Sequence, residues 1–181
     1  DVLRDLCQLA LRLPSHIGFY NGVGAGASIP GHFHFQFFNR APDFPSFPIE
    51  ERDFTTAKNV EDPELIVDYP IKVLRWQGNL EKVVSNAVLW ISKWIKSKAE
   101  LSALLSTNFI TTAGPPNDEI TLYFAPRDKS KQFWNGNRGI VGGLEVLGEL
   151  VMASEDELAL IEKGVVNYQF IQQALSAVSM D

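Results

Sequence analysis

The sequence has little of what marks secreted, membrane-spanning or disulfide-stabilised proteins. Its 181 residues include one cysteine, Cys7, so no disulfide can form within the chain, which is compatible with a reducing compartment. No apolar run reaches the roughly 18 residues that a membrane span needs. The mixed charges of residues 1–5 do not resemble a signal peptide. We therefore expect a cytoplasmic protein without membrane contact, and we interpret Cys7 as a small buried residue.

The sequence also lacks an excess of positive charge. It carries 16 Lys and Arg residues against 22 Asp and Glu residues, which gives a formal net charge of −6. This balance argues against a nucleic acid partner, because such a partner is held through a broad positive surface. It does not exclude a small anionic ligand, which backbone N–H groups and one or two cations can bind.

What is present is a hydrophobic content of 45% and two kinds of periodicity, which fit one domain over residues 1–181. Helical spacing of apolar residues covers 2–13, 80–98, 155–163 and 167–178. Strand-like patterns cover 17–22, 32–38, 65–76, 108–113, 119–125 and 142–152. Irregular structure is expected in the excursion 39–63 and the polar loop 127–137. This mixture predicts an α+β fold, with flanking helices on an antiparallel sheet.

The segment His32-Phe33-His34-Phe35-Gln36 is the most distinctive part of the chain. In an extended strand, alternate side chains share a face, so His32, His34 and Gln36 are expected on one side. The phenylalanines between them are expected on the other side, in the core. An ordinary amphipathic strand with an exposed polar face would explain the same pattern. A zinc site is a further alternative, although the third histidine, His16, is expected to be a surface or structural histidine.

The residues before this strand favour a phosphate site over these alternatives. Residues 22–28 contain three glycines, two alanines and a serine, so their backbone can approach a ligand and donate N–H groups to phosphate oxygens. Asn21 and Ser28 add polar side chains. A histidine ring is largely uncharged at neutral pH and can attack phosphorus without a separate base. Gln36 can donate a hydrogen bond to phosphate at any pH.

This pattern, Asn21-Gly22-x-Gly24…Gly26-Ala27-Ser28 followed by His32-x-His34-x-Gln36, resembles the signature of the histidine-triad superfamily. It is most similar to the branch with Gln in third place. That branch contains galactose-1-phosphate uridylyltransferase, diadenosine tetraphosphate phosphorylase and GDP-L-galactose phosphorylase. The resemblance implies a HIT-like fold and a nucleotidyl-histidine intermediate.

Carried over by position, the resemblance implies that His34 is the nucleophile and that His32 shapes the site. Gln36, Asn21 and Ser28 would bind phosphate oxygens, and Gly24 and Gly26 would add backbone donors. Weaker similarity extends to Phe47-Pro48-Ile49-Glu50, to the strand that ends in Pro126-Arg127, and to residues 142–150.

The sequence departs from the family pattern in two places. Gly31 is an extra residue between Pro30 and His32, which affects the role of Ser28. The chain begins at the helix that follows the first strands of the HIT-like fold, so we expect part of the nucleoside pocket to come from a preceding region. A partner chain that completes the sheet and a loss of the activity are the two alternatives. An incomplete sheet edge would also be compatible with a homodimer.

Several other side chains are candidates of lower rank. Arg127, with Lys129 and Lys131, is read as part of a solvated basic loop or as a phosphate clamp. Arg40, just past the histidine strand, is open to the same two interpretations. Trp90 and Trp94 lie one helical turn apart and are expected in the core or an interface.

The leading hypothesis is therefore a nucleotidyltransferase or phosphorylase that acts on a nucleotide sugar or dinucleoside polyphosphate, with phosphate or a sugar phosphate as acceptor. No cofactor and no metal are expected. Two alternatives stay open, namely a histidine-triad hydrolase and a non-catalytic nucleotide-binding domain.

Overall fold

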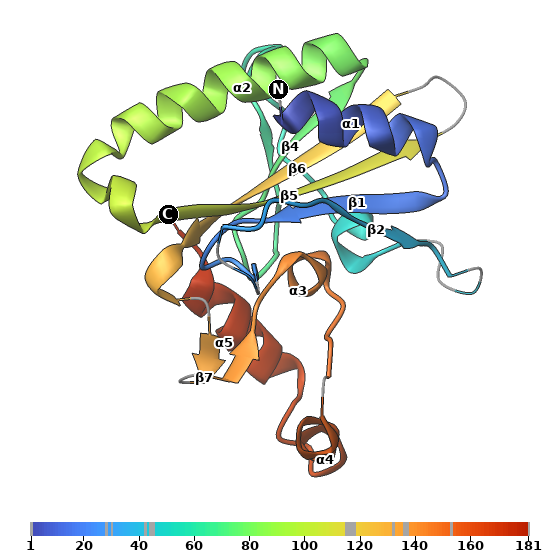
Figure 1. Ribbon diagram of the computed structural model, residues 1–181, viewed down its shortest axis with the longest axis vertical. Helices are drawn as coiled ribbons and strands as arrows, with labels where there is room; N and C mark the ends of the chain where they lie inside the picture. Colours follow the sequence, from blue (N-terminus) through green and yellow to red (C-terminus); the bar gives the residue numbers. More distant parts are fainter. Residues whose placement is uncertain are drawn as a thin grey trace.

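The computed structural model describes residues 2–27, 29, 31–41, 43, 46–114, 119–131, 133–135, 138–152 and 154–180, with 133–135 and 138–140 described by their backbone alone. Its centre is a six-stranded sheet with helices on both faces (Figure 1). The elements in chain order are α1 (Val2–Arg12), β1 (His16–Asn21), β2 (Gln36–Asn39), η1 (Pro48–Glu51), β3 (Glu64–Leu65), β4 (Leu74–Gly78), α2 (Leu80–Ser97), η2 (Ala99–Leu104), β5 (Leu105–Gly114), β6 (Glu119–Asp128), η3 (Lys129–Lys131), β7 (Phe133–Asn135), β8 (Arg138–Ile140), α3 (Gly143–Leu147), α4 (Glu155–Glu162) and α5 (Tyr168–Val178).

The sheet has the strand order β2-β1-β5-β6-β4-β3, and every neighbouring pair is antiparallel. The hairpin β5–β6 forms its middle, with a register that runs from Leu105 opposite Asp128 to Gly114 opposite Glu119. β1 pairs with β5 on one side and with β2 on the other. The strand β2, which ends the histidine segment, is therefore an edge strand of the sheet.

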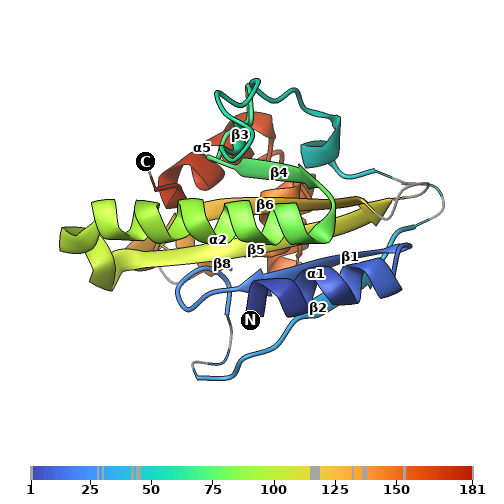
Figure 2. The ribbon, with the colours of Figure 1, turned by 90° about the horizontal axis from the view of Figure 1, so that it is seen from above.

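Helices α1 and α2 cover one face of the sheet (Figure 2). Their apolar side chains meet those of β4, β5 and β6 in one core cluster, which includes Leu3, Cys7, Val84, Leu122 and Phe124. Cys7 is completely buried there, as the sequence predicts. Trp90 and Trp94 each pack edge-on against Phe124.

The opposite face of the sheet carries a second core cluster. Ile17 and Phe19 of β1, Ile110 of β5 and Tyr123 of β6 pack there against residues that follow β2 and against the C-terminal third of the chain. η1, α3 and α5 lie on this side, whereas α4 stands away from the sheet (Figure 1). The histidine segment therefore joins the sheet at its edge, next to the C-terminal elements that pack on this face.

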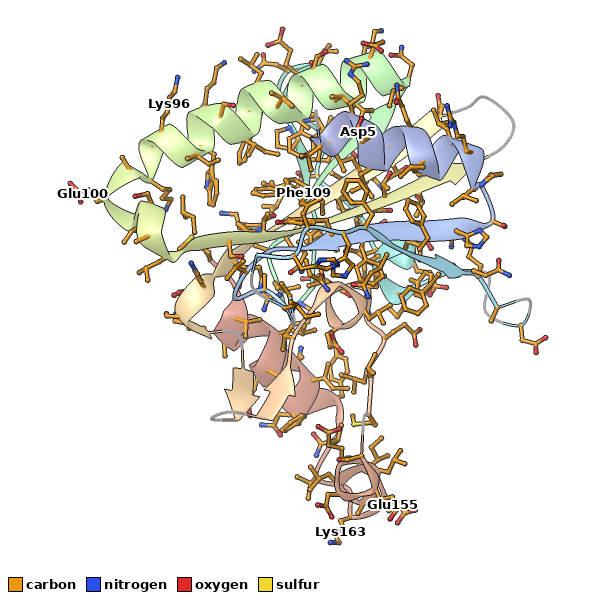
Figure 3. All side chains as sticks on the ribbon, viewed as in Figure 1. Asp5, Lys96, Glu100, Phe109, Glu155 and Lys163 are labelled. Atoms are coloured by element: carbon orange, nitrogen blue, oxygen red, sulfur yellow. The ribbon has the colours of Figure 1, made fainter. Side chains whose placement is uncertain are left out.

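The side chains follow this layering (Figure 3). Phe109 points from the sheet toward α1 and α2, and it packs against the cluster that those helices form. Lys96 and Glu100 point away from the sheet into solvent, at the far end of α2 and in η2. Glu155 and Lys163 mark α4, which buries none of its residues.

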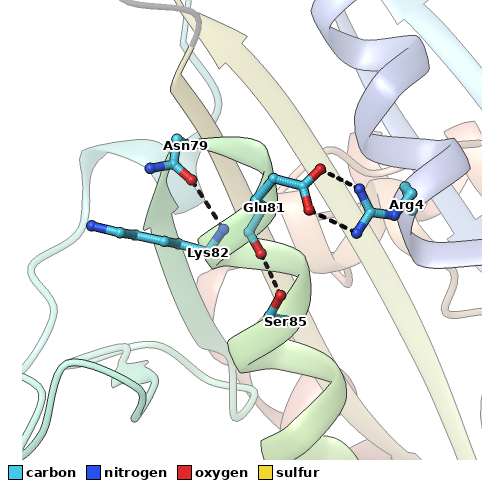
Figure 4. Close-up of polar contacts among 5 residues, drawn as sticks. All are labelled: Arg4, Asn79, Glu81, Lys82 and Ser85. Carbon is cyan, nitrogen blue, oxygen red and sulfur yellow. Dashed lines mark hydrogen bonds and ion pairs between the residues drawn. The ribbon is translucent and has the colours of Figure 1, made fainter.

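Polar contacts fix the start of α2 (Figure 4). The Asn79 side-chain oxygen accepts a hydrogen bond from Lys82 N at 3.0 Å, which satisfies one of the free N–H groups of the first turn. Glu81 forms a two-pronged ion pair with Arg4 of α1. This pair links the two helices that cover the sheet, at the protein surface, where water screens its contribution to stability.

The predicted α+β class with an antiparallel sheet is confirmed, as are helices at 2–13, 80–98, 155–163 and 167–178 within one or two residues. Three local predictions were wrong. Residues 142–152 contain the short helix α3 instead of a strand, and β6 continues into the predicted polar loop as far as Asp128. That loop also contains β7. The predicted strand 32–38 becomes the shorter strand β2, and the excursion that follows it carries the short helix η1.

Candidate functional site

The candidate segment leaves the sheet at Asn21 and returns to it at Gln36. The ladder between β1 and β2 runs from His16 opposite Asn39 to Phe19 opposite Gln36. Residues 22–27, which we call the glycine turn, fold back on themselves through hydrogen bonds from Ala25 N and Ala27 N to Gly22 O, at 2.9 and 3.3 Å. The predicted phosphate ligand Ser28 lies outside the described residues.

The two histidines precede the paired part of the strand, which begins only at Gln36. Their rings nevertheless lie on the same side, with centroids 5.0 Å apart and planes tilted by 36°. Gln36 faces Asn21 across the sheet, with 3.5 Å between Gln36 Oε1 and Asn21 Nδ2. The two histidines therefore share a side as the sequence predicts, although regular strand pairing does not enforce this arrangement.

The aromatic side of the segment is less buried than predicted. Phe33 packs on Tyr20 and on Phe35, with ring centroids 5.2 and 5.1 Å apart, yet it is 52% exposed. Phe38 instead falls on the face of Phe19, where the two rings stack at 5.4 Å. The prediction that this aromatic side forms core is wrong for Phe33, because β2 lies at the edge of the sheet and no described layer closes over it.

His34 has an unusual environment. Its Nδ1 is buried and, among the residues that the structure describes, has no hydrogen-bond partner. Leaving a buried polar atom unpaired costs about 1–3 kcal/mol, and unsatisfied groups of this kind often mark functional positions. His32 is exposed and His34 half-buried, so the enclosed ring is the one that the family resemblance selects as nucleophile.

Two donors to its Oδ1 hold the Asn21 side chain in place. Asn108 Nδ2 donates to it at 2.7 Å, and Gly143 N, at the start of α3, donates at 2.9 Å. The amide orientation is therefore defined by the protein, and the Asn21 Nδ2 group is directed toward Gln36. If Asn21 binds a phosphate oxygen, this Nδ2 group has to be the donor.

The glycines of the turn permit close packing in addition to backbone flexibility. A Cβ on Gly24, where φ is +75°, would lie 2.7 Å from Lys129 O, and one on Gly26, where φ is +98°, would lie 2.5 Å from Gly142 Cα. Both positions require glycine for conformation and for space. Their predicted role as backbone donors to phosphate stays a prediction.

Arg127 does not lie in a solvated loop. It is a β6 residue with 0% exposure, and its guanidinium donates to Asn108 Oδ1 at 2.6 Å, Val141 O at 2.8 Å and Val178 O at 3.2 Å. Burial lowers the pKa of Arg127 to about 10, against a smaller opposing effect of the Glu145 carboxylate. Because these guanidinium N–H groups donate to buried protein atoms, Arg127 supports the site from the protein interior and does not line it.

Sequence reasoning missed Asn108, which is also completely buried. Asn108 connects Arg127 to the glycine turn, because its Nδ2 donates both to Asn21 Oδ1 and to Ala25 O at 2.7 Å. The available signal was an asparagine at the start of a predicted strand, where this residue type is depleted. Glu145 was missed as well; burial raises its pKa, and its Oε2 accepts from Gly142 N at 2.8 Å.

The remaining candidates lie elsewhere. Arg40 forms a two-pronged ion pair with Glu50 of η1, at 2.6 and 2.7 Å, which ties the excursion to the end of β2. His16 Nδ1 lies 3.0 Å from Ser15 Oγ, in the connection between α1 and β1. Lys129 and Lys131 are exposed. Within the described part of the chain, no group of three or more His, Cys, Asp or Glu side chains could hold a metal ion.

The family match to known proteins lies in the region of the candidate site. A family described as "Domain of unknown function (DUF4922)" matches residues 1–39, which contain α1, β1, the glycine turn, both site histidines and β2. No curated protein and no solved structure matches the chain. None of the helices in the described residues is long and apolar enough to cross a membrane.

Proposed function

We propose that the protein is a nucleotidyltransferase or phosphorylase of the histidine-triad superfamily, in the branch with glutamine in third place. The observation that carries the proposal is the arrangement of His34, Gln36 and Asn21. The Nδ1 atom of His34 is buried without a partner among the described residues, and the uncharged amides of Gln36 and Asn21 lie 3.5 Å from each other. Asn21 comes directly before the glycine turn, and His34 and Gln36 follow it in the sequence. Neutral donors beside a histidine suit a phosphoryl group, because they stabilise added negative charge without protonating the nucleophile.

The chemistry would proceed in two displacements. A ring nitrogen of His34 attacks the α-phosphorus of the substrate, a P–N bond forms, and the P–O bond to the leaving group breaks. The leaving group is a sugar phosphate from a nucleotide sugar, or a nucleoside polyphosphate from a dinucleoside polyphosphate. An oxygen of the acceptor phosphate or sugar phosphate then attacks the same phosphorus, and the P–N bond breaks. Because Nδ1 is enclosed, attack falls to Nε2. The Asn21 and Gln36 amides would hold the nonbridging oxygens during both steps.

The proposal is tested by incubating the protein with UDP-glucose, GDP-glucose and diadenosine tetraphosphate, with and without inorganic phosphate. Mass spectrometry should find a nucleoside monophosphate adduct on His34, and added phosphate should release it as a nucleoside diphosphate. His34→Ala should abolish adduct and turnover, whereas His16→Ala, a matched histidine outside the site, should leave both unchanged.

Two results would replace the proposal by one of its alternatives. Release of free nucleoside monophosphate without added phosphate would make the protein a hydrolase. Tight nucleotide binding without adduct or turnover would make it a non-catalytic nucleotide-binding domain. Full activity of the His34→Ala variant would refute the histidine mechanism outright.

A further inference from the structure

A chain of buried hydrogen bonds runs behind the candidate site. It starts at Val178 O, at the end of α5, and passes through the Arg127 guanidinium to Asn108 Oδ1. From Asn108 Nδ2 it divides to Asn21 Oδ1 and Ala25 O. Segments of β6, β5, β1 and the glycine turn are thereby joined through two side chains that are both completely buried.

The Arg127 guanidinium is unusual among buried cations because its three hydrogen-bond acceptors are uncharged. Two of them are backbone carbonyls and the third is the Asn108 amide. Burying a cation is costly unless its hydrogen bonds are made, and each of these bonds restricts where its partner can lie.

The Asn108 side chain connects Arg127 to the site because its amide oxygen accepts from Arg127 and its amide nitrogen donates toward the site. Its Oδ1 can face Arg127 only if its Nδ2 faces Asn21 and Ala25. The Asn21 amide must then present Oδ1 to Asn108 and to Gly143 N, which directs its Nδ2 toward Gln36. The orientation of the half-buried Asn21 amide is thus set by a guanidinium on another strand.

We infer that Asn108 and Arg127 are positioning residues for the phosphate-binding groups: they orient the Asn21 amide and the glycine turn without contacting the ligand. This inference rests on the proposed function for its ligand, and it replaces the sequence prediction of Arg127 as a direct phosphate clamp. It also makes the docking of α5, through Val178 O, a condition for a correctly formed site.

The most informative variant is Asn108→Asp. A carboxylate keeps an acceptor for Arg127 and gives the buried cation an ionic partner, so the fold should be retained. The variant loses both Nδ2 donors, and its second oxygen would repel Asn21 Oδ1 and Ala25 O. The Asn21 amide should then rotate, turning Nδ2 toward the new carboxylate and away from Gln36.

The first measurement needs no ligand. In ¹⁵N NMR spectra, Asn108→Asp should shift the Asn21 side-chain amide signals and the Gly26 and Gly143 backbone signals. Thr111→Val is the matched control, because Thr111 is a completely buried polar residue of the same strand whose hydroxyl points to Cys7 on the other face. Unchanged Asn21 amide signals in a folded Asn108→Asp protein would overturn the inference.

The second measurement is a double-mutant cycle on ligand affinity. It uses whichever of UDP-glucose, GDP-glucose and diadenosine tetraphosphate the wild type binds. Asn108→Asp should weaken binding about tenfold or more, as expected for one lost hydrogen bond to a charged ligand. Asn21→Ala should weaken it as well, and the loss of the double variant should be smaller than the sum of the two single losses, because part of the Asn108 effect passes through the Asn21 amide. Additive losses would contradict the inference, and a wild type that binds no nucleotide would refute the proposed function while the NMR result still decides the inference.

Discussion

Gly26 and Gly142, which are 116 positions apart in the sequence, are in direct backbone contact: a Cβ on Gly26 would lie 2.5 Å from the Gly142 Cα. The contact joins the glycine turn to the residue before α3. Since a backbone atom cannot move aside as a flexible side chain can, the turn and the start of α3 fit only with glycine at this position.

Gly26→Ala should therefore destabilise the protein by about 1–3 kcal/mol, through the left-handed backbone at φ +98° together with the clash. Gly31→Ala is the matched control. Gly31 also has a left-handed backbone, with φ +79°, but its Cβ would meet no atom within 4 Å. It should cost only the conformational part, about 1 kcal/mol. Urea unfolding of both variants measures the difference, and equal losses would show that the contact with Gly142 is unimportant.

The N-cap of α2 gives a prediction that is independent of the site. Asn79→Ala removes the acceptor for Lys82 N and should lower the free energy of unfolding by about 1 kcal/mol. Asn79→Asp retains an oxygen at the same place and should stay close to the wild type. Chemical denaturation followed by circular dichroism checks both, and an Asn79→Ala protein as stable as the wild type would count against the cap.

The stability of the protein should fall at alkaline pH. Burial raises the pKa of Cys7 from its ordinary 9.0 to about 11, and burial with the Glu50 charge raises the pKa of Tyr123 from 10.0 to about 12. Burial also raises the pKa of Tyr69. Since each folded-state pKa lies above the unfolded value, their contribution is complete below about pH 9 and is lost as pH rises through the folded values.

Urea midpoints measured from pH 7 to pH 11 should show this decline above about pH 9. Cys7→Ala removes one of the titrating groups and should flatten the decline between pH 9 and 11, within the interval between the two thiol values. The same burial should make the Cys7 thiol of the folded protein slow to react with alkylating agents at pH 8. Rapid alkylation without unfolding would contradict the buried position.

Elements with a long periodic pattern were predictable from the sequence, whereas short elements fixed by individual contacts were not. The helices α1 and α2 were predictable because their apolar residues recur at helical spacing, and each helix buries that face on the sheet. The short apolar run after Gly142 was not, since periodicity cannot distinguish a brief strand from a brief helix. The Glu145 carboxylate, bonded to Gly142 N, and the left-handed Gly148 start and end α3 there.

The candidate site shows the same division. The shared side of His32, His34 and Gln36 was predicted from alternation along an extended chain, and the structure places the two histidine rings together, with centroids 5.0 Å apart. The burial of Arg127 could not be predicted, because it depends on strand pairing with β5 and on carbonyls from residues 141 and 178. Asn108 stayed unnoticed for the same reason: its partners are distant in sequence.

The bond from Gly143 N to Asn21 Oδ1 spans 122 positions, and this separation has a consequence for how the binding unit comes into being. Residues 1–39, the part that the matched family covers, hold the histidines but neither Asn108, Arg127 nor Gly143. Such a peptide would carry the motif without its scaffold. Contacts of this sequence separation form only after much of the chain has been ordered. During synthesis, therefore, the chain should become able to bind its ligand only after Gly143 has left the ribosome and the sheet has formed. The emergence of the histidine segment alone should not be sufficient.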